Sequence, residues 1–409
     1  MNMPADQTST SEIFVGRQAI FDTKLDVHAY ELLFRDGHVG GANVVDGNKA
    51  TSQVIINAFL VIGVEQVVQH NIAFINLTRD FLIGDIPFPL PPGKVVLEVL
   101  EDVAVDTELV SALERFKNEG YTIALDDFVL DEKNRALIPF ADIIKIDLMA
   151  LSQRELIEQV KTLKQYNVKL LAEKVETKQE FELCKQLGFE YYQGYYFCRP
   201  DVMTGKQLPP NRLALLEMIS TLQDVDCSFN ELEAIISKDV AISYKLLRII
   251  NSSFYGLPKA VESIQKALVV LGLQALRNWV TVIGLSQIDD KPQELVNISL
   301  TRAKMCELLA PATRCDKNTA FTVGLFSMLD VLMDQPITDL LSKLPLAEEI
   351  SEALIERNGS LGELLTLVIT YEQGTWENFE DNTAASISEI RQAYIDALEW
   401  SNEITSQMK

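Results

Sequence analysis

Polar side chains recur at the ends of short apolar runs in the first half of the chain. The residues at these positions are Glu31, Asn76, Glu98, Asp126 with Asp127, Lys145 with Asp147, Glu173 with Glu176, and Gln193. Five or six carboxylates that share one site cannot all stay ionised unless cations neutralise them. Ligands that are all oxygen favour Mg²⁺, Mn²⁺ or Ca²⁺ over zinc, so a pair of divalent metal ions is the predicted occupant.

The elements that position these residues alternate between strands and helices. Strands are expected at 13–21, 29–35, 72–78, 95–101, 122–128, 143–148, 169–175 and 191–197. Most are separated by helical patterns, at 50–68, 106–120, 151–165 and 177–188, whose apolar residues recur three and four positions apart. Gly120 and Gly188 are predicted to close two of these helices as C-cap glycines.

This alternation predicts a mostly parallel sheet, closed as a (β/α)8 barrel over residues 12–205. Reactive groups of such barrels come from the C-terminal ends of the strands, where the polar residues lie. The first two strands are joined by residues 22–28, too few for a helical crossover. We therefore expect an antiparallel hairpin at the start of the barrel.

The second half of the chain, 206–409, is predicted to be all-α. It follows a Pro/Gly linker at 201–211, and breaks are expected at 255–259, Gly272 and 335–338. Two apolar features are predicted to be core, the run at 268–272 and the stripe Tyr244, Leu246, Leu247 and Ile250. The tail at 384–405 is an amphipathic helix, expected to pack internally rather than against another molecule.

Composition excludes several classes of protein. With 36 basic and 59 acidic residues the net charge is -23, which disfavours DNA and anionic membranes as partners. No membrane span and no export signal are recognisable, so residence in the cytoplasm is expected. The five cysteines are scattered and never form CxxC, which predicts reduced packing residues.

Several of these motifs together resemble the EAL domain, the barrel that hydrolyses the bacterial second messenger cyclic di-GMP. The resemblance runs in order over about residues 12–205 and rests on Asn76 and on the stretches 30-YELLFR-35, 98-EVLE-101, 125-LDDF-128, 144-IKID-147, 173-EKVE-176 and 193-QGYYF-197. It implies metal-dependent hydrolysis to the linear dinucleotide, with two Mg²⁺ or Mn²⁺ ions as cofactors.

The resemblance also implies a role for each residue. The metal ligands would be Glu31, Asn76, Glu98, Asp126 and Asp127. Lys145 would touch the attacking water or phosphate, Glu173 would be the general base, and Gln193 would contact water or metal. Gln18, Arg35 and Asp147 would hold the dinucleotide, and Glu101 and Glu176 would support the site. Independently of the resemblance, a phosphodiester is an anion facing a chain of charge -23, so Arg17 is a further cation expected to help bring it close.

Two alternatives accompany this interpretation. In the EAL family the loop after the DDF triplet contains glycine, whereas residues 126–140 of this chain contain none. Because this loop shapes the metal site, the second hypothesis is a cyclic di-GMP receptor or scaffold without turnover. Lys145 could also be an aldolase-type Schiff-base lysine, but that role needs a lowered pKa, and neighbouring carboxylates would raise it.

Residues 237–280 resemble the HDOD domain, a helical relative of the HD phosphohydrolases. Those enzymes bind metal through paired His and Asp residues, but the only histidines are His28, His38 and His70, and 325-LFSMLD-330 stands where a histidine-bearing helix is expected. Hydrolysis in this half is therefore not expected. A regulatory role or a docking site for an unknown protein partner is expected instead, by analogy with bacterial EAL/HDOD signalling proteins, with a homodimer as a further option.

Overall fold

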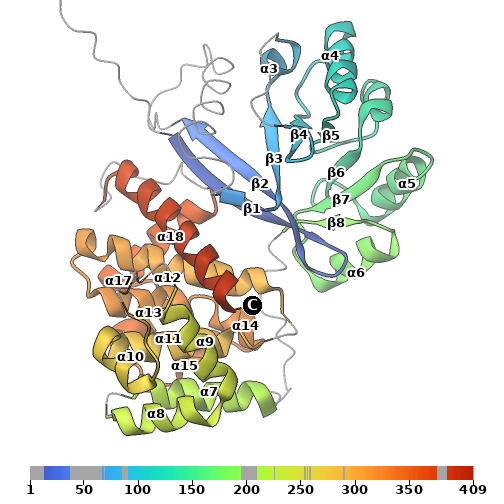
Figure 1. Ribbon diagram of the computed structural model, residues 1–409. Helices are drawn as coiled ribbons and strands as arrows, with labels where there is room; N and C mark the ends of the chain where they lie inside the picture. Colours follow the sequence, from blue (N-terminus) through green and yellow to red (C-terminus); the bar gives the residue numbers. More distant parts are fainter. Residues whose placement is uncertain are drawn as a thin grey trace, which may run out of the picture.

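A barrel and a helical domain make up the described part of the protein (Figure 1). The structure is a computed structural model that describes residues 13–36, 67–68, 70–84, 91–194, 210–224, 226–252, 255, 257, 259–288, 291–374 and 385–408. The predicted helix at 50–68 lies outside these residues except for 67–68. The predicted junction at 205–206 also lies outside them, so it stays a prediction.

Eight strands close into a barrel in chain order. They are β1 (Ile13–Asp22), β2 (Val27–Asp36), β3 (Ile72–Leu77), β4 (Val95–Val99), β5 (Thr122–Leu125), β6 (Ile143–Asp147), β7 (Lys169–Glu173) and β8 (Tyr191–Tyr192). β1 is antiparallel to both β2 and β8, and the other neighbours are parallel. The predicted barrel and its first hairpin are confirmed.

Short helices connect the parallel strands. They are α3 (Arg79–Ile83), α4 (Thr107–Asn118), the 3₁₀ helix η1 (Asn134–Phe140), α5 (Gln153–Leu163) and α6 (Lys178–Gln186). Capping boxes start two of them, Ser152 with Glu155 at α5 and Thr177 with Glu180 at α6. Gly120 and Gly188 follow α4 and α6 with φ of 91° and 80°, as the sequence predicted.

One apolar side chain from each strand fills the inside of the barrel. This apolar layer consists of Ile20, Ala29, Phe74, Val96, Ala124, Ile143, Leu171 and Tyr191. Each is at most 6% exposed, so the interior at this level is a packed core rather than a channel. The space for a ligand inside the barrel is therefore on the side of this layer that lies toward the C-terminal ends of β2 to β8.

The helical domain confirms the predicted change of architecture. It contains α7 (Pro210–Gln223), α8 (Phe229–Lys238), α9 (Val240–Ile250), α10 (Ile264–Leu271), α11 (Leu273–Leu285), α12 (Gln293–Thr313), α13 (Lys317–Phe326), α14 (Leu329–Met333), α15 (Ile337–Leu341), α16 (Glu348–Ile355), α17 (Gly359–Glu372) and α18 (Ile387–Met408). Gly272, with φ of 78°, separates α10 from α11 at a predicted break. By the usual length and hydropathy test, no single helix within the described ranges could cross a membrane, while α10 and α11 pass it only as a bent pair.

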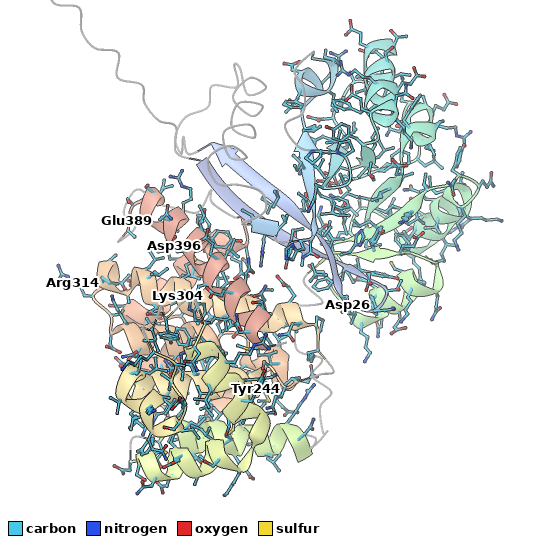
Figure 2. The ribbon with its side chains drawn as sticks, viewed as in Figure 1. Asp26, Tyr244, Lys304, Arg314, Glu389 and Asp396 are labelled. Atoms are coloured by element: carbon cyan, nitrogen blue, oxygen red, sulfur yellow. The ribbon has the colours of Figure 1, made fainter. Side chains whose placement is uncertain are left out.

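Two core predictions in this domain are wrong in part. Leu246 and Ile250 are fully buried, but Tyr244, on the same helix α9, is 64% exposed (Figure 2). In the run at 268–272, Val269 is 85% and Val270 44% exposed. The buried residue of helix α10 is Ala267, so Val269 and Val270 lie on the side of the helix that is exposed to solvent. The tail helix α18 packs internally as predicted, with Trp400 and Ile404 buried.

The helical domain covers the outer face of the β1–β2 hairpin, as Figure 1 shows. No helix of the barrel follows β1, so this face depends on another part of the chain for cover. The Tyr30 hydroxyl donates a hydrogen bond of 2.8 Å to Glu294 Oε2 at the start of α12. Arg17 lies 3.6 Å from Glu294 Oε1 and stacks over the Tyr30 ring. These three buried side chains join the two domains.

Candidate active site

Eight polar side chains meet at the mouth of the barrel, directly above the apolar layer. Side chains alternate along a strand, so the residue two positions beyond each apolar-layer residue also points inward. That position lies toward the C-terminal end of β2 to β8 and, because β1 is antiparallel, toward the N-terminal end of β1. We call these eight residues the polar ring: Gln18, Glu31, Asn76, Glu98, Asp126, Lys145, Glu173 and Gln193.

The Lys145 ammonium occupies the centre of the polar ring. Its Nζ lies 2.6 Å from Asp126 Oδ1, 2.7 Å from Glu98 Oε1 and 3.0 Å from Glu173 Oε1. A fourth carboxylate, Glu31, has its Oε1 at 3.6 Å. Lys145 and Glu98 are completely buried, so these interactions are poorly screened by water.

Amide side chains complete the ring around Glu31. Asn76 Nδ2 donates to Glu31 Oε1 at 3.0 Å, and Gln193 Nε2 donates to Glu31 Oε2 at 2.6 Å. Gln193 Nε2 also lies 2.9 Å from Gln18 Oε1, which links the ring to β1. The sequence predicted Gln18 as a contact to the dinucleotide but missed that it belongs to the ring.

The ring carries more negative than positive charge, and its pKa values reflect this. Burial would raise the pKa of Glu31, but Lys145 and the two amides outweigh it and hold that pKa below its usual value. For Glu98 burial dominates, and its pKa lies well above the usual range. Burial, with the nearby charges of Asp126 and Glu31, raises the pKa of Glu173 to about 8. Burial would lower the pKa of Lys145, yet the surrounding carboxylates raise it well above its usual value. The aldolase alternative, which needs a lowered lysine pKa, is therefore not supported.

The donor set of the ring fits a divalent cation, although its side chains are arranged around a lysine. Four carboxylates against one ammonium leave three surplus negative charges when all are ionised. Among the described residues, Asn76 Oδ1, Glu98 Oε2 and Glu173 Oε2 are buried oxygens that accept no hydrogen bond. Such oxygens suit Mg²⁺ or Mn²⁺. However, no three Asp, Glu, His or Cys side chains of the described ranges are placed to ligate one metal ion. The ligand roles predicted from the sequence therefore stay predictions.

A second acidic group lies outside the ring. Asp147 Oδ2 pairs with Lys174 Nζ at 2.5 Å, and the pKa of Asp127 is raised by its own burial, an effect that Lys174 opposes. Asp127 and Lys174 both have left-handed backbone, with φ of 40° and 54°. Such strained conformations concentrate at functional sites. Lys174 was not predicted, although it directly follows the predicted base Glu173.

Other predicted site residues lie apart from the ring. Glu101 is exposed, and Glu176 is half-buried beyond the end of β7. Arg17 does not face the ring, because its side chain leaves β1 on the outer face toward Glu294. It is therefore not placed to contact a phosphodiester at the ring, and its predicted role as a cation near the dinucleotide stays a prediction. The side chain of Arg35 lies outside the described residues.

The loop after Asp127 is held by the barrel without glycine. The Phe128 amide donates to the Lys145 carbonyl at 3.0 Å. Gln159 of α5 donates to the Phe128 carbonyl at 2.8 Å and accepts from the Leu130 amide at 3.3 Å. This buried glutamine fixes the segment next to Asp126 by means that the sequence did not reveal.

In the helical domain, Arg302 of α12 contacts the stretch 325–330, where a histidine-bearing helix was expected. Arg302 donates to Ser327 Oγ at 3.2 Å and contacts the sulfur of Met328 at 3.1 Å. It also pairs with both carboxylate oxygens of Glu372, at 2.6 and 2.7 Å. The stretch 325–330 therefore packs against a buried guanidinium, and the absence of hydrolysis in this domain stays a prediction.

Comparisons with known proteins identify both parts of the chain. Residues 56–200 match the EAL domain, and residues 208–352 match the HDOD domain. The chain is 34% identical over 400 residues to the cyclic di-GMP phosphodiesterase CdgJ of Vibrio cholerae. The matched region covers 96% of this chain and 93% of that protein. It is 32% identical over 403 residues to the uncharacterized protein YuxH of Bacillus subtilis, with coverages of 96% and 98%. Among solved structures it is similar to a manganese and cyclic di-GMP complex of BlrP1 from Klebsiella pneumoniae, at 21% identity, covering 46% of this chain and 56% of that chain, with a TM-score of 0.39.

Proposed function

The chain belongs to the family of proteins in which an EAL domain is followed by an HDOD domain, and we propose that it hydrolyses cyclic di-GMP at the polar ring. The observation that carries this proposal is the ring itself, in which every strand of the barrel contributes one polar side chain to one mouth. A relative that matches almost the full length of the chain is named as a cyclic di-GMP phosphodiesterase. The helical domain, in this proposal, regulates the barrel without catalysis of its own.

Divalent metal ions are part of the proposal. Glu31, Asn76, Glu98 and Asp126 would hold them, with Asp127 as a further ligand at the edge of the ring. Bound there, Mg²⁺ or Mn²⁺ would lower the pKa of a water molecule and neutralise the charge of the phosphodiester. The buried oxygens of the ring that accept no hydrogen bond support this assignment.

The side chains of the ring divide the remaining work. Glu173, one of whose oxygens accepts no hydrogen bond, takes the proton of the attacking water. Lys145 turns its ammonium from the carboxylates to an oxygen of the phosphodiester, and Gln193 and Gln18 orient the substrate. The water oxygen bonds to phosphorus, the bond from phosphorus to one ribose oxygen breaks, and that oxygen takes a proton from solvent water. The product is the linear dinucleotide.

The receptor hypothesis retains one specific observation in its favour. Lys145 already neutralises part of the ring, since its Nζ lies within 3.6 Å of four carboxylates. A ring that stays closed on its own lysine would bind the dinucleotide without turning it over. A protein partner of the helical domain, a homodimer and residence in the cytoplasm likewise stay predictions.

Chromatography of the nucleotides separates the two hypotheses. Purified protein is incubated with cyclic di-GMP and Mn²⁺ or Mg²⁺, and with EDTA as the metal-free reference. We expect the linear dinucleotide only with metal, and a loss of about 10²- to 10⁴-fold in rate for Glu173→Gln. Glu158→Gln, an exposed glutamate on α5, is the matched control and should retain the full rate. Saturable binding without product would favour the receptor, and equal rates for both variants would refute the assigned base.

A further inference from the structure

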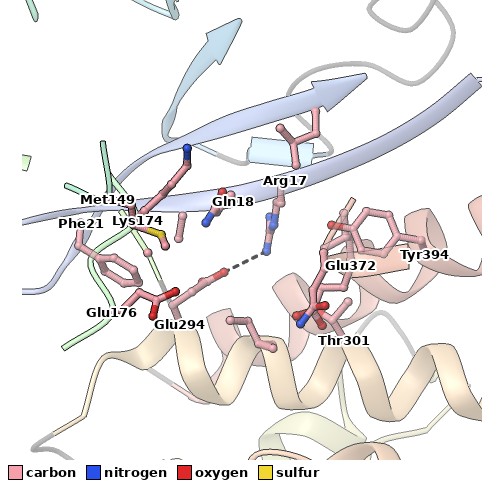
Figure 3. A pocket seen from close by; sticks show the side chains of 16 residues that line it. Arg17, Gln18, Phe21, Met149, Lys174, Glu176, Glu294, Thr301, Glu372 and Tyr394 are labelled. Atoms are coloured by element: carbon pink, nitrogen blue, oxygen red, sulfur yellow. Dashed lines mark ion pairs between the residues drawn. The ribbon is translucent and has the colours of Figure 1, made fainter. Parts of the chain in front are cut away.

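A cavity of about 360 Å³ lies between the barrel and the helical domain (Figure 3). Gln18, Phe21, Met149 and Glu176 are among its walls on the barrel side. Its other wall comes from α12, α17 and α18 of the helical domain. The volume is at the lower end of the range of about 300–1,000 Å³ for small-molecule sites, so it suits part of a dinucleotide rather than the whole.

This cavity adjoins the polar ring through Gln18. The Gln18 side chain lines the cavity and accepts a hydrogen bond from Gln193, which in turn donates to Glu31. A nucleobase is separated from its phosphate by a single ribose. A phosphodiester held at the ring therefore brings one of its two bases to the entrance of the cavity.

The walls of the cavity have the chemistry of a nucleobase site. Apolar and aromatic side chains face it from both domains, with Phe21 and Met149 on one side and Ile298, Tyr394 and Leu398 on the other. Flat bases bind well against such surfaces, because every base has a π-face that stacks or packs on them. The lining also contains polar groups that can meet the edge of a purine, Glu176 of the barrel and Gln373 after α17.

The two walls are fixed to each other by the buried contacts that join the domains. Arg17, 8% exposed, and Glu294, 6% exposed, form an ion pair across the cavity, and Glu294 also binds the Tyr30 hydroxyl. On the far wall, Glu372 is held by both of its oxygens to Arg302. Arg17, Glu294 and Glu372 are thus held in ion pairs, and the apolar side chains of the lining are available to a ligand.

We infer that the helical domain supplies the second wall of the substrate site, and that this cavity binds one guanine base of cyclic di-GMP while the phosphodiester lies at the polar ring. The inference rests on the proposed function and extends it. The helical domain then contributes directly to substrate affinity, in addition to any regulation. Its residues Ile298 and Gln373 become determinants of specificity for the dinucleotide over smaller phosphodiesters.

Two substitutions that fill the cavity test this inference in the full-length protein. Ile298→Trp narrows it from α12, and Gln373→Trp does so from an exposed position where misfolding is not expected. Leu308→Trp, on the outer side of α12, is the control. Each protein is assayed with Mn²⁺ on cyclic di-GMP and on bis(p-nitrophenyl) phosphate, a phosphodiester without nucleobases.

We expect both cavity variants to raise KM for cyclic di-GMP by about tenfold or more, as for loss of base stacking, with the rate on the small phosphodiester unchanged. The control should match the wild type on both substrates. Folded cavity variants with an unchanged KM would overturn the inference while leaving the proposed function intact. If the wild type turns over neither substrate, the proposed function fails, and the inference about the cavity is tested by calorimetric titration with cyclic di-GMP and Ca²⁺. Weaker binding of cyclic di-GMP by the cavity variants than by the wild type would support the inference. Equal binding by variants and wild type, or no binding by either, would overturn it.

Discussion

The contact between Glu294 and Arg17 predicts that the two domains are held together by a buried charge pair. The perturbation is Glu294→Gln, which keeps the shape of the side chain but leaves the Arg17 guanidinium without its anion. Removing one partner of a buried ion pair typically costs about 3–5 kcal/mol. The pair here is long, at 3.6 Å, and Arg17 retains a hydrogen bond to the Val67 carbonyl and its contact with the Tyr30 ring. We therefore expect a smaller loss, of about 2–3 kcal/mol.

Thermal unfolding followed by circular dichroism measures this loss. For a unit of roughly 200 residues, 1 kcal/mol corresponds to about 2–4 °C, so the first transition should fall by about 4–12 °C. Glu158→Gln breaks an exposed pair with Arg154 and should change stability by less than about 0.5 kcal/mol.

A double variant provides the sharper test of the same pair. Replacing both Arg17 and Glu294 by Met removes both buried charges, so it should cost less than Glu294→Gln alone. A transition for Glu294→Gln that matches Glu158→Gln, or a double variant as unstable as the sum of its single substitutions, would refute the reasoning.

Two further predictions concern the backbone at the barrel mouth and the buried thiols. Gly194 has φ of 151°, and a Cβ there would lie 2.3 Å from the Val175 amide nitrogen, so Gly194→Ala should lower the free energy of unfolding by about 3 kcal/mol. Gly93→Ala, at φ of 87° with nothing within 4 Å, should cost only about 1 kcal/mol in the same urea titration, and equal costs would contradict the proposed overlap. Burial raises the pKa of Cys184 and of Cys306 to about 12, so at pH 8 only about one thiol in 10⁴ is ionised. Iodoacetamide should therefore spare both thiols in the folded protein at pH 8, whereas rapid labelling at that pH, detected by mass spectrometry, would show that these thiols are accessible.

Much of the polar ring was predictable because strands impose a period of two. Glu31, Glu98 and Glu173 each lie two residues beyond an apolar side chain of a short strand, and their types are unusual for a buried position. The same rule also places Gln18 in the ring. Because β1 is antiparallel to its neighbours, its ring residue lies two positions before Ile20 and not two positions after it.

Other features depend on tertiary contacts that no local pattern encodes. Arg17 is predicted as a cation near the substrate because the chain is strongly acidic and has few cations near the predicted site. Its side chain points away from the barrel interior, on the opposite face of β1 from Gln18. Its partner Glu294 begins a helix of the other domain, and nothing in the spacing of the two residues links them. Val269 shows the reverse case, in which an apolar residue is exposed because α10 has no neighbour on that side among the described residues.

The central claim is that the polar ring binds divalent cations and, with them, the phosphodiester. Anomalous scattering from crystals soaked with Mn²⁺ and cyclic di-GMP tests it most directly. We expect manganese peaks between the side chains of Glu31, Asn76, Glu98 and Asp126, with the phosphodiester beside them. A ring without manganese, in which the Lys145 ammonium still contacts all four carboxylates, would contradict it.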